Sequence, residues 1–118
     1  MHVEKEQRWA FGEEISGTSQ SKGVTRKILA YHDEGMCVAH IFEAGAGGEP
    51  HSHPHTQITY VAEGVFEFEI DGKKNVVKKG DAMFKESGVE HSAVCLEKGV
   101  LIDFFTPMRE DFICGKSD

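Results

Sequence analysis

Three histidines at alternate positions, His51, His53 and His55, are the part of this sequence best suited to chemistry. Gln57 continues the same spacing, and His91 lies in a later segment. Residues two apart on an extended strand face the same side, so His51 and His53 can direct two ring nitrogens to one point. Imidazole is the commonest metal ligand among side chains. If a second strand brings His91 to that point, the chain holds a mononuclear metal site.

A second candidate is Asp103, which stands inside the apolar run 99–105. Burying a carboxylate without a partner is costly, so its position needs an explanation. Alternation places Leu101, Asp103 and Phe105 on one face. If that face is the interior, Asp103 can lie near the metal as a general acid or base, and Phe105 walls the pocket. The alternative is a structural aspartate that accepts backbone hydrogen bonds at an edge or bulge.

Arg109 follows a few residues later, in a Pro-Met-Arg-Glu-Asp-Phe segment. A guanidinium matches a carboxylate with two hydrogen bonds, so Arg109 can bind an anionic substrate or pair with a neighbouring surface acid. Pro54 bends the chain at His55, which is therefore expected beside the metal ligands or at the rim of the site. Three further histidines have no partner in the sequence and are expected to be ordinary surface or packing residues: His2, His32 and His40.

The remaining sequence consists of short apolar segments separated by turn residues. Phe66, Phe68 and Ile70 alternate with charged residues, and Asp71-Gly72 is a strong hairpin signal. No long amphipathic helix is predicted, although 107–112 can form one helical turn. This pattern predicts an all-β sandwich or barrel. The predicted strands are 25–31, 36–43, 57–63, 65–70, 75–78, 82–85, 91–96 and 100–106.

Composition narrows the classes of function. The chain has 118 residues, which fits one domain, and a formal net charge of -7, which disfavours nucleic-acid binding. No segment has the length of a membrane span, and residues 1–18 lack the apolar core of a signal peptide. The three cysteines include no pair at two-residue spacing, so neither disulfides nor a zinc ribbon are expected. Cys37 and Cys95 are expected to be buried, and a reducing, cytoplasmic location is expected.

Two segments carry a family resemblance. Residues 48–57 followed by Gly64 resemble the first cupin motif, with Gln57 at the usual acidic ligand position. Residues 80–81 and 86–91 resemble the second, with Glu86 in place of its usual proline. The resemblance implies a single-domain double-stranded β-helix, or jelly-roll barrel, that binds one divalent metal ion (Ni, Zn, Fe or Mn). The ligands that it implies are His51, His53, Gln57 and His91. Three imidazoles and an amide leave the charge of the ion uncompensated, which makes it a strong Lewis acid.

A narrower resemblance extends over residues 24–112. The His-Ser-His-Pro-His-x-Gln run and the Pro-x-Arg-Glu-Asp-Phe segment resemble those of the pectin-degradation cupins. This implies metal-dependent ring opening of 4,5-unsaturated uronate monosaccharides, from pectin or alginate breakdown, to linear 5-keto-4-deoxyuronate. It also implies roles in turnover for Asp103, Phe105 and Arg109, with Phe105 and Arg109 contacting the small anionic sugar.

The expected organisation is an N-terminal extension over 1–22, as an edge strand or a disordered segment, a barrel over 23–112 and a tail over 113–118. A homodimer is expected, because small barrels often cover an edge strand by pairing. Two other functions remain open, since a fold does not determine a function. One is an Fe(II)-dependent cupin dioxygenase, and the other is a non-catalytic uronate-binding module.

Overall fold

A computed structural model describes residues 7–114 and confirms the all-β prediction. The strands form one antiparallel sheet in the order β1-β2-β3-β7-β4-β5, with β6 paired to β4. The elements are a 3-10 helix (Gly12–Glu14), β1 (Thr18–Ser21), β2 (Val24–His32), β3 (Gly35–Phe42), β4 (Thr56–Ile70), β5 (Lys73–Lys78), β6 (Ala82–Lys85), β7 (His91–Thr106) and α1 (Glu110–Cys114).

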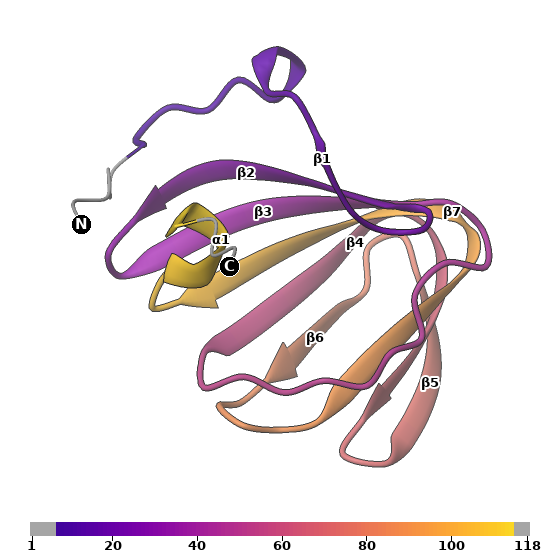
Figure 1. The fold of residues 1–118 in the computed structure, drawn as a ribbon. Helices are drawn as coiled ribbons and strands as arrows, with labels where there is room; N and C mark the ends of the chain where they lie inside the picture. Colours follow the sequence, from indigo (N-terminus) through magenta and orange to yellow (C-terminus); the bar gives the residue numbers. More distant parts are fainter. Residues whose placement is uncertain (1–6, 115–118) are drawn as a thin grey trace.

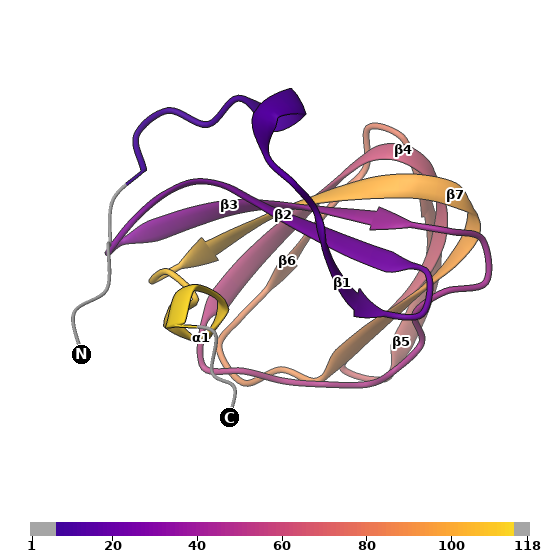
Figure 2. The ribbon, with the colours of Figure 1, turned by 45° about the horizontal axis from the view of Figure 1, so that its top comes forward.

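The sheet curls into a jelly-roll barrel. Strands β2 and β3 form one side, and β5 and β6 form the opposite side, in both views of the ribbon (Figures 1 and 2). Strands β4 and β7 are the longest, and they pair with each other along most of their length. Because β7 also pairs with β3, and β4 also pairs with β5 and β6, this central pair connects the two sides and places its inward side chains in the middle of the barrel.

Two predicted strand breaks are wrong. The sequence analysis ends a strand at Gly64, but residues 56–70 form one strand that bends there. Gly64 has a φ of 88°, and the pairing with β7 shifts register on both sides of it. The glycine therefore makes a bulge, which curves a strand without ending it. In the same way, residues 97–99 do not separate two strands, because β7 continues across Gly99 to Thr106.

The interior has two apolar clusters. Leu101 belongs to the larger cluster and Phe105 to the smaller one. Asp103 lies between them on β7, and its face is buried as the alternation predicted, with Leu101, Asp103 and Phe105 no more than 4% exposed. On β3, His40 stands in the same way between Val38 and Phe42. Asp103 and His40 thus belong to a row of polar side chains, the polar belt, which lies between the two apolar clusters.

The described residues before β2 lie along that strand at the edge of the sheet. Strand β1 is the edge strand and pairs with β2, and Gln7 forms a β-bridge to Tyr31. Positions 1–6 and 115–118, including His2, lie outside the described residues, and the domain boundaries at 23 and 112 stay a prediction. Cys95 is buried as expected, whereas Cys37 is only partly buried. Within residues 7–114, no helix is long and apolar enough to cross a membrane.

The bend at Gly64 provides a test of the fold. A Cβ at Gly64 would lie 2.5 Å from the Cα of Gly99 and 2.6 Å from two carbonyl oxygens, whereas a Cβ at Gly72 meets nothing within 4 Å. The two glycines have similar positive φ angles, so Gly72→Ala carries only the conformational cost of about 1–2 kcal/mol. We expect Gly64→Ala to lower the free energy of unfolding by clearly more, as measured in urea. Equal losses would show that the close crossing of β4 and β7 is not a constraint.

Candidate metal centre

Main-chain hydrogen bonds hold the two histidine-bearing segments together. His51 and His91 exchange both backbone N–H···O bonds, each 2.9 Å long. The amide of Gly88 donates to the carbonyl of His53 at 2.8 Å. The loop between β3 and β4 is thereby fastened to the start of β7. These backbone hydrogen bonds bring together the two motifs, which are far apart in the sequence.

The imidazoles of His51, His53 and His91 converge. One ring nitrogen of each lies within 4.8 Å of the others. The Nδ1 atom of each ring lies 3.0–3.1 Å from a backbone carbonyl, those of residues 49, 55 and 89 respectively. A carbonyl only accepts, so each Nδ1 carries the proton and each Nε2 presents a lone pair. Histidines that bind a metal are typically oriented by such a bond from the other nitrogen.

The acceptors at this centre lack donors. Nε2 of His91 is buried and has no hydrogen-bond partner among the described residues. Nε2 of His53 lies 2.8 Å from Oε1 of Gln57, so an imidazole lone pair faces an amide oxygen. Burial lowers the pKa of His53, and it lowers that of His91 to about 4, which keeps these rings neutral at pH 7. A divalent cation fits this set of lone pairs.

Hydrogen bonds to Asp103 and Thr59 fix the orientation of the Gln57 side chain. Its Nε2 donates to Oδ1 of Asp103 at 2.7 Å and to the hydroxyl of Thr59 at 3.3 Å. An ionised carboxylate accepts only, so the amide nitrogen must face Asp103 and the amide oxygen must face the imidazoles. Asp103 therefore controls which atom of Gln57 reaches the centre.

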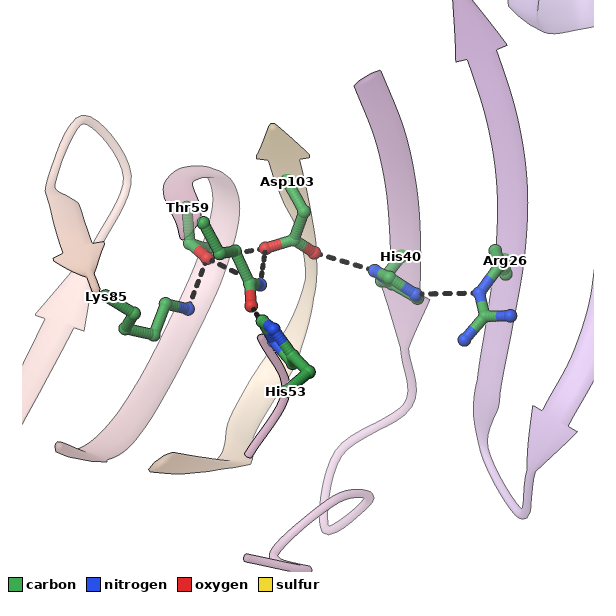
Figure 3. A network of polar contacts seen from close by, with 7 residues as sticks. Arg26, His40, His53, Thr59, Lys85 and Asp103 are labelled. Carbon is green, nitrogen blue, oxygen red and sulfur yellow. Dashed lines mark hydrogen bonds and ion pairs between the residues drawn. The ribbon is translucent and has the colours of Figure 1, made fainter. Parts of the chain in front are cut away.

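Asp103 is the middle of the polar belt, which crosses five strands (Figure 3). Oδ1 accepts from the Thr59 hydroxyl at 2.5 Å, and Thr59 in turn accepts from Nζ of Lys85 at 2.5 Å. On the other side, His40 Nδ1 lies 2.7 Å from Oδ2, and Arg26 Nε donates to His40 Nε2 at 3.1 Å. Strand pairing explains these contacts, because Thr59 is directly opposite Asp103 and Arg26 is directly opposite His40.

The belt excludes an Asp103 that accepts backbone hydrogen bonds at a sheet edge, whereas a role in catalysis stays a prediction. Strand β7 lies between β3 and β4, so Asp103 is not at a sheet edge, and the groups that donate to it within residues 7–114 are side chains. Burial alone would raise the pKa of Asp103. The hydrogen bond from His40, the ammonium of Lys85 and the Thr59 hydroxyl outweigh burial and hold this pKa well below its ordinary value. Asp103 is thus a buried carboxylate that stays ionised.

Most residues of the belt were not predictable from local sequence patterns. The expectation that His40 is an ordinary residue is wrong, since its side chain is 14% exposed and faces Asp103. Its place between Val38 and Phe42 in the alternation was the available signal, and the parity of Thr59 with Gln57 was another. Arg26 and Lys85 gave no local signal, because only strand register brings them to the belt. His32 is exposed, as expected.

A cavity of about 260 Å³ opens beside the belt. Phe105 and Arg109 both line it, with the guanidinium carbon of Arg109 5.1 Å from the centre of the Phe105 ring. Arg109 also donates two hydrogen bonds to Asp111, at 3.1 and 2.9 Å, so it has the surface partner that the sequence offered as the alternative. His55 lies outside the group of three, with its ring 6.5 Å from that of Phe105.

A rolled antiparallel sheet with three converging imidazoles, one exposed, one half-buried and one buried, is the architecture of a cupin. Residues 39–104, more than half of the chain, match the family model described as a cupin domain. The chain therefore belongs to the cupin family. The resemblance drawn from the two motifs is thereby confirmed.

Individual proteins within the family are also similar to this chain. The chain is 43% identical over 108 residues to the pectin degradation protein KdgF of Dickeya dadantii (strain 3937), across 90% of this chain and 98% of that protein. The solved structure of KdgF from Halomonas sp. superposes with a TM-score of 0.85 at 38% identity, covering 88% of this chain and 96% of that one. An RmlC-like cupin from Shewanella frigidimarina NCIMB 400 gives 0.89 at 39% identity, covering 92% and 98%.

Removing single imidazoles tests the centre. We expect the protein to bind one Ni²⁺ per chain in calorimetric titration, and His91→Ala to weaken binding by more than about 100-fold, because loss of a ligand exceeds loss of a supporting contact. His55→Ala is the matched control, since His55 belongs to the same run but lies outside the group, and it should bind within a few-fold of wild type. Equal weakening by both variants would show that the histidine run binds metal non-specifically, without a defined set of ligands.

The pH dependence of stability tests the burial of Lys85. Burial lowers the pKa of Lys85 to about 8 from 10.5, so between these values the unfolded chain binds more protons than the folded one. Stability contributed by this group must then rise with pH, by up to about 3 kcal/mol from pH 8 to 10.5. We expect the free energy of unfolding of wild type to gain this amount relative to Lys85→Met. The exposed control Lys74→Met should follow wild type, and parallel profiles for all three proteins would contradict the assignment.

Proposed function

We propose that this protein opens the ring of 4,5-unsaturated uronate monosaccharides to give linear 5-keto-4-deoxyuronate, with a divalent metal bound by His51, His53, Gln57 and His91. The observation that carries the proposal is the contact between Asp103 and Gln57. Asp103 is the only buried carboxylate among residues 7–114, and it holds the amide whose oxygen faces the imidazoles. The identity to a pectin degradation protein supports the substrate class.

The reaction is an isomerisation, so it needs no oxidant or reductant. The anomeric hydroxyl loses its proton, the bond between C1 and the ring oxygen breaks, and C1 becomes an aldehyde. The electrons of that bond pass to the ring oxygen, which becomes the enolate oxygen on C5. A proton then adds to C4, the double bond moves to the oxygen, and the 5-keto product forms. One proton leaves the substrate and one returns.

The residues of the cavity fit these steps. Asp103, held ionised by its donors, accepts the proton of the anomeric hydroxyl and can return it towards C4. Phe105, which is 3% exposed, provides an apolar wall that excludes water beside the carboxylate. Arg109 binds the substrate carboxylate. Its guanidinium then donates hydrogen bonds both to the substrate and to Asp111. A metal ion at the imidazoles, when bound, supplies Lewis-acid stabilisation of the developing enolate.

The size of the cavity favours a monosaccharide. Its volume of about 260 Å³ is below the roughly 300–1,000 Å³ of pockets that hold drug-sized ligands, and a polysaccharide would not fit inside it. Three cationic side chains, those of Arg26, Lys85 and Arg109, line the cavity, which suits an anionic substrate. We further propose a cytoplasmic location and a homodimer, which fractionation and light scattering can test.

The activity is tested with the unsaturated galacturonate monosaccharide, by following the loss of its conjugated absorbance. We expect turnover by the metal-loaded wild type and a loss of about 10²–10⁴-fold in Asp103→Asn, which removes the proton acceptor. The side-chain oxygen of the introduced asparagine can still accept from Gln57, so the metal content should stay that of wild type. Asp33→Asn, which changes an exposed aspartate outside the cavity, is the matched control and should keep full turnover.

Four results would each count against the proposal. Full turnover by Asp103→Asn would remove Asp103 from the mechanism. Unchanged turnover after chelation would remove the metal. Saturable binding of the uronate with a constant absorbance would favour a binding module, and dependence of turnover on dioxygen, with oxygen uptake, would favour a dioxygenase.

A further inference from the structure

The side of the belt that faces away from the imidazoles has no role in the steps above. It consists of His40 and Arg26, which connect Asp103 to the neighbouring strands β3 and β2 (Figure 3). His40 is largely buried, and the guanidinium carbon of Arg26 lies 3.5 Å from the centre of the Phe112 ring. Arg26 is therefore anchored by stacking as well as by its hydrogen bond.

Arg26 and Asp103, on opposite sides of the ring, together determine the tautomer of His40. A guanidinium N–H can only donate, so Nε2 of His40 must accept the bond from Arg26 Nε at 3.1 Å. The proton of a neutral imidazole then lies on Nδ1. That N–H donates to Oδ2 of Asp103 at 2.7 Å. An imidazole protonated on Nε2 would set two donors against each other, and Arg26 excludes it.

The hydrogen bonds of Asp103 leave one acceptor position open. A carboxylate offers about four lone-pair positions, two on each oxygen. Oδ1 uses both, for Gln57 at 2.7 Å and for Thr59 at 2.5 Å. Oδ2 uses one, for His40. The open position is therefore on Oδ2, the oxygen that His40 holds.

We infer that His40, fixed by Arg26, is a positioning residue that sets the orientation of Oδ2 of Asp103, the oxygen that exchanges the proton with the substrate. This inference rests on the proposed function. The bond from His40 holds the carboxylate plane from one side, so the open lone pair of Oδ2 keeps a constant direction towards the cavity. Without that bond the carboxylate can rotate about its Cβ–Cγ bond, which displaces Oδ2. Displacement of a reacting atom by about 1 Å can lower the rate by about 100-fold.

Two substitutions at position 40 separate positioning from simple packing. Asparagine places its side-chain N–H near the position of Nδ1, so His40→Asn can still donate to Oδ2, whereas His40→Leu fills the space and cannot donate. We expect His40→Leu to lower kcat by about 10- to 100-fold, with KM within about threefold of wild type and unchanged metal content. His40→Asn should recover most of kcat. Equal kcat values for the two variants, or wild-type kcat in His40→Leu, would overturn the inference.

The tautomer is measured directly by ¹H–¹⁵N NMR of the ring nitrogens in zinc-loaded protein. We expect a protonated Nδ1 and a bare Nε2 for His40 in wild type. In Arg26→Met the donor to Nε2 is lost, so Nε2 should become protonated in part or all of the molecules, while Nδ1 keeps the proton that it donates to Asp103. A protonated Nε2 in wild type would overturn the inference. If wild type fails to turn over the uronate, the proposed function and the catalytic part of the inference both fall, while the spectrum still decides the tautomer.

Discussion

The structure depends on an ionised aspartate buried in the middle of a β-barrel. A carboxylate removed from water needs donors, and Asp103 obtains them from Gln57, Thr59 and His40. Each donor is thereby fixed in orientation. Because Gln57 turns its nitrogen to Asp103, its oxygen faces the imidazoles, and the candidate metal centre acquires its fourth acceptor. One buried charge thus organises side chains on both sides of β7.

The polar belt has this role because it is confined between two apolar clusters. Leu101 on one side and Phe105 on the other keep water from Asp103. Lys85 balances the negative charge through Thr59, whose hydroxyl receives from the lysine and donates to the carboxylate. Removing one member would leave a buried charge or donor without its partner, which costs more than the loss of an exposed pair.

The sequence predicted the features that are local in the chain. The alternate histidines and the inward face of Asp103 follow from a spacing of two residues, and the turn at Asp71 follows from its Asp-Gly pair. What could not be predicted depends on strand register, which relates residues far apart in sequence. Arg26 reaches the belt only because it pairs with His40 across β2 and β3. The bend at Gly64 likewise cannot be distinguished from a strand end in the sequence, since a glycine indicates a bulge or a turn equally well until the partner strand is known.

The backbone bridge between His51 and His91 has a consequence for how the protein matures. The residues that would hold the cation come from the loop before β4, from the start of β4 and from the first residue of β7, so they meet only when the sheet has rolled shut. A ligand that binds only the native state shifts the folding equilibrium by mass action. A cation held by these side chains would therefore stabilise only the folded chain, and it would lower the fraction of newly made chain that is open to proteolysis.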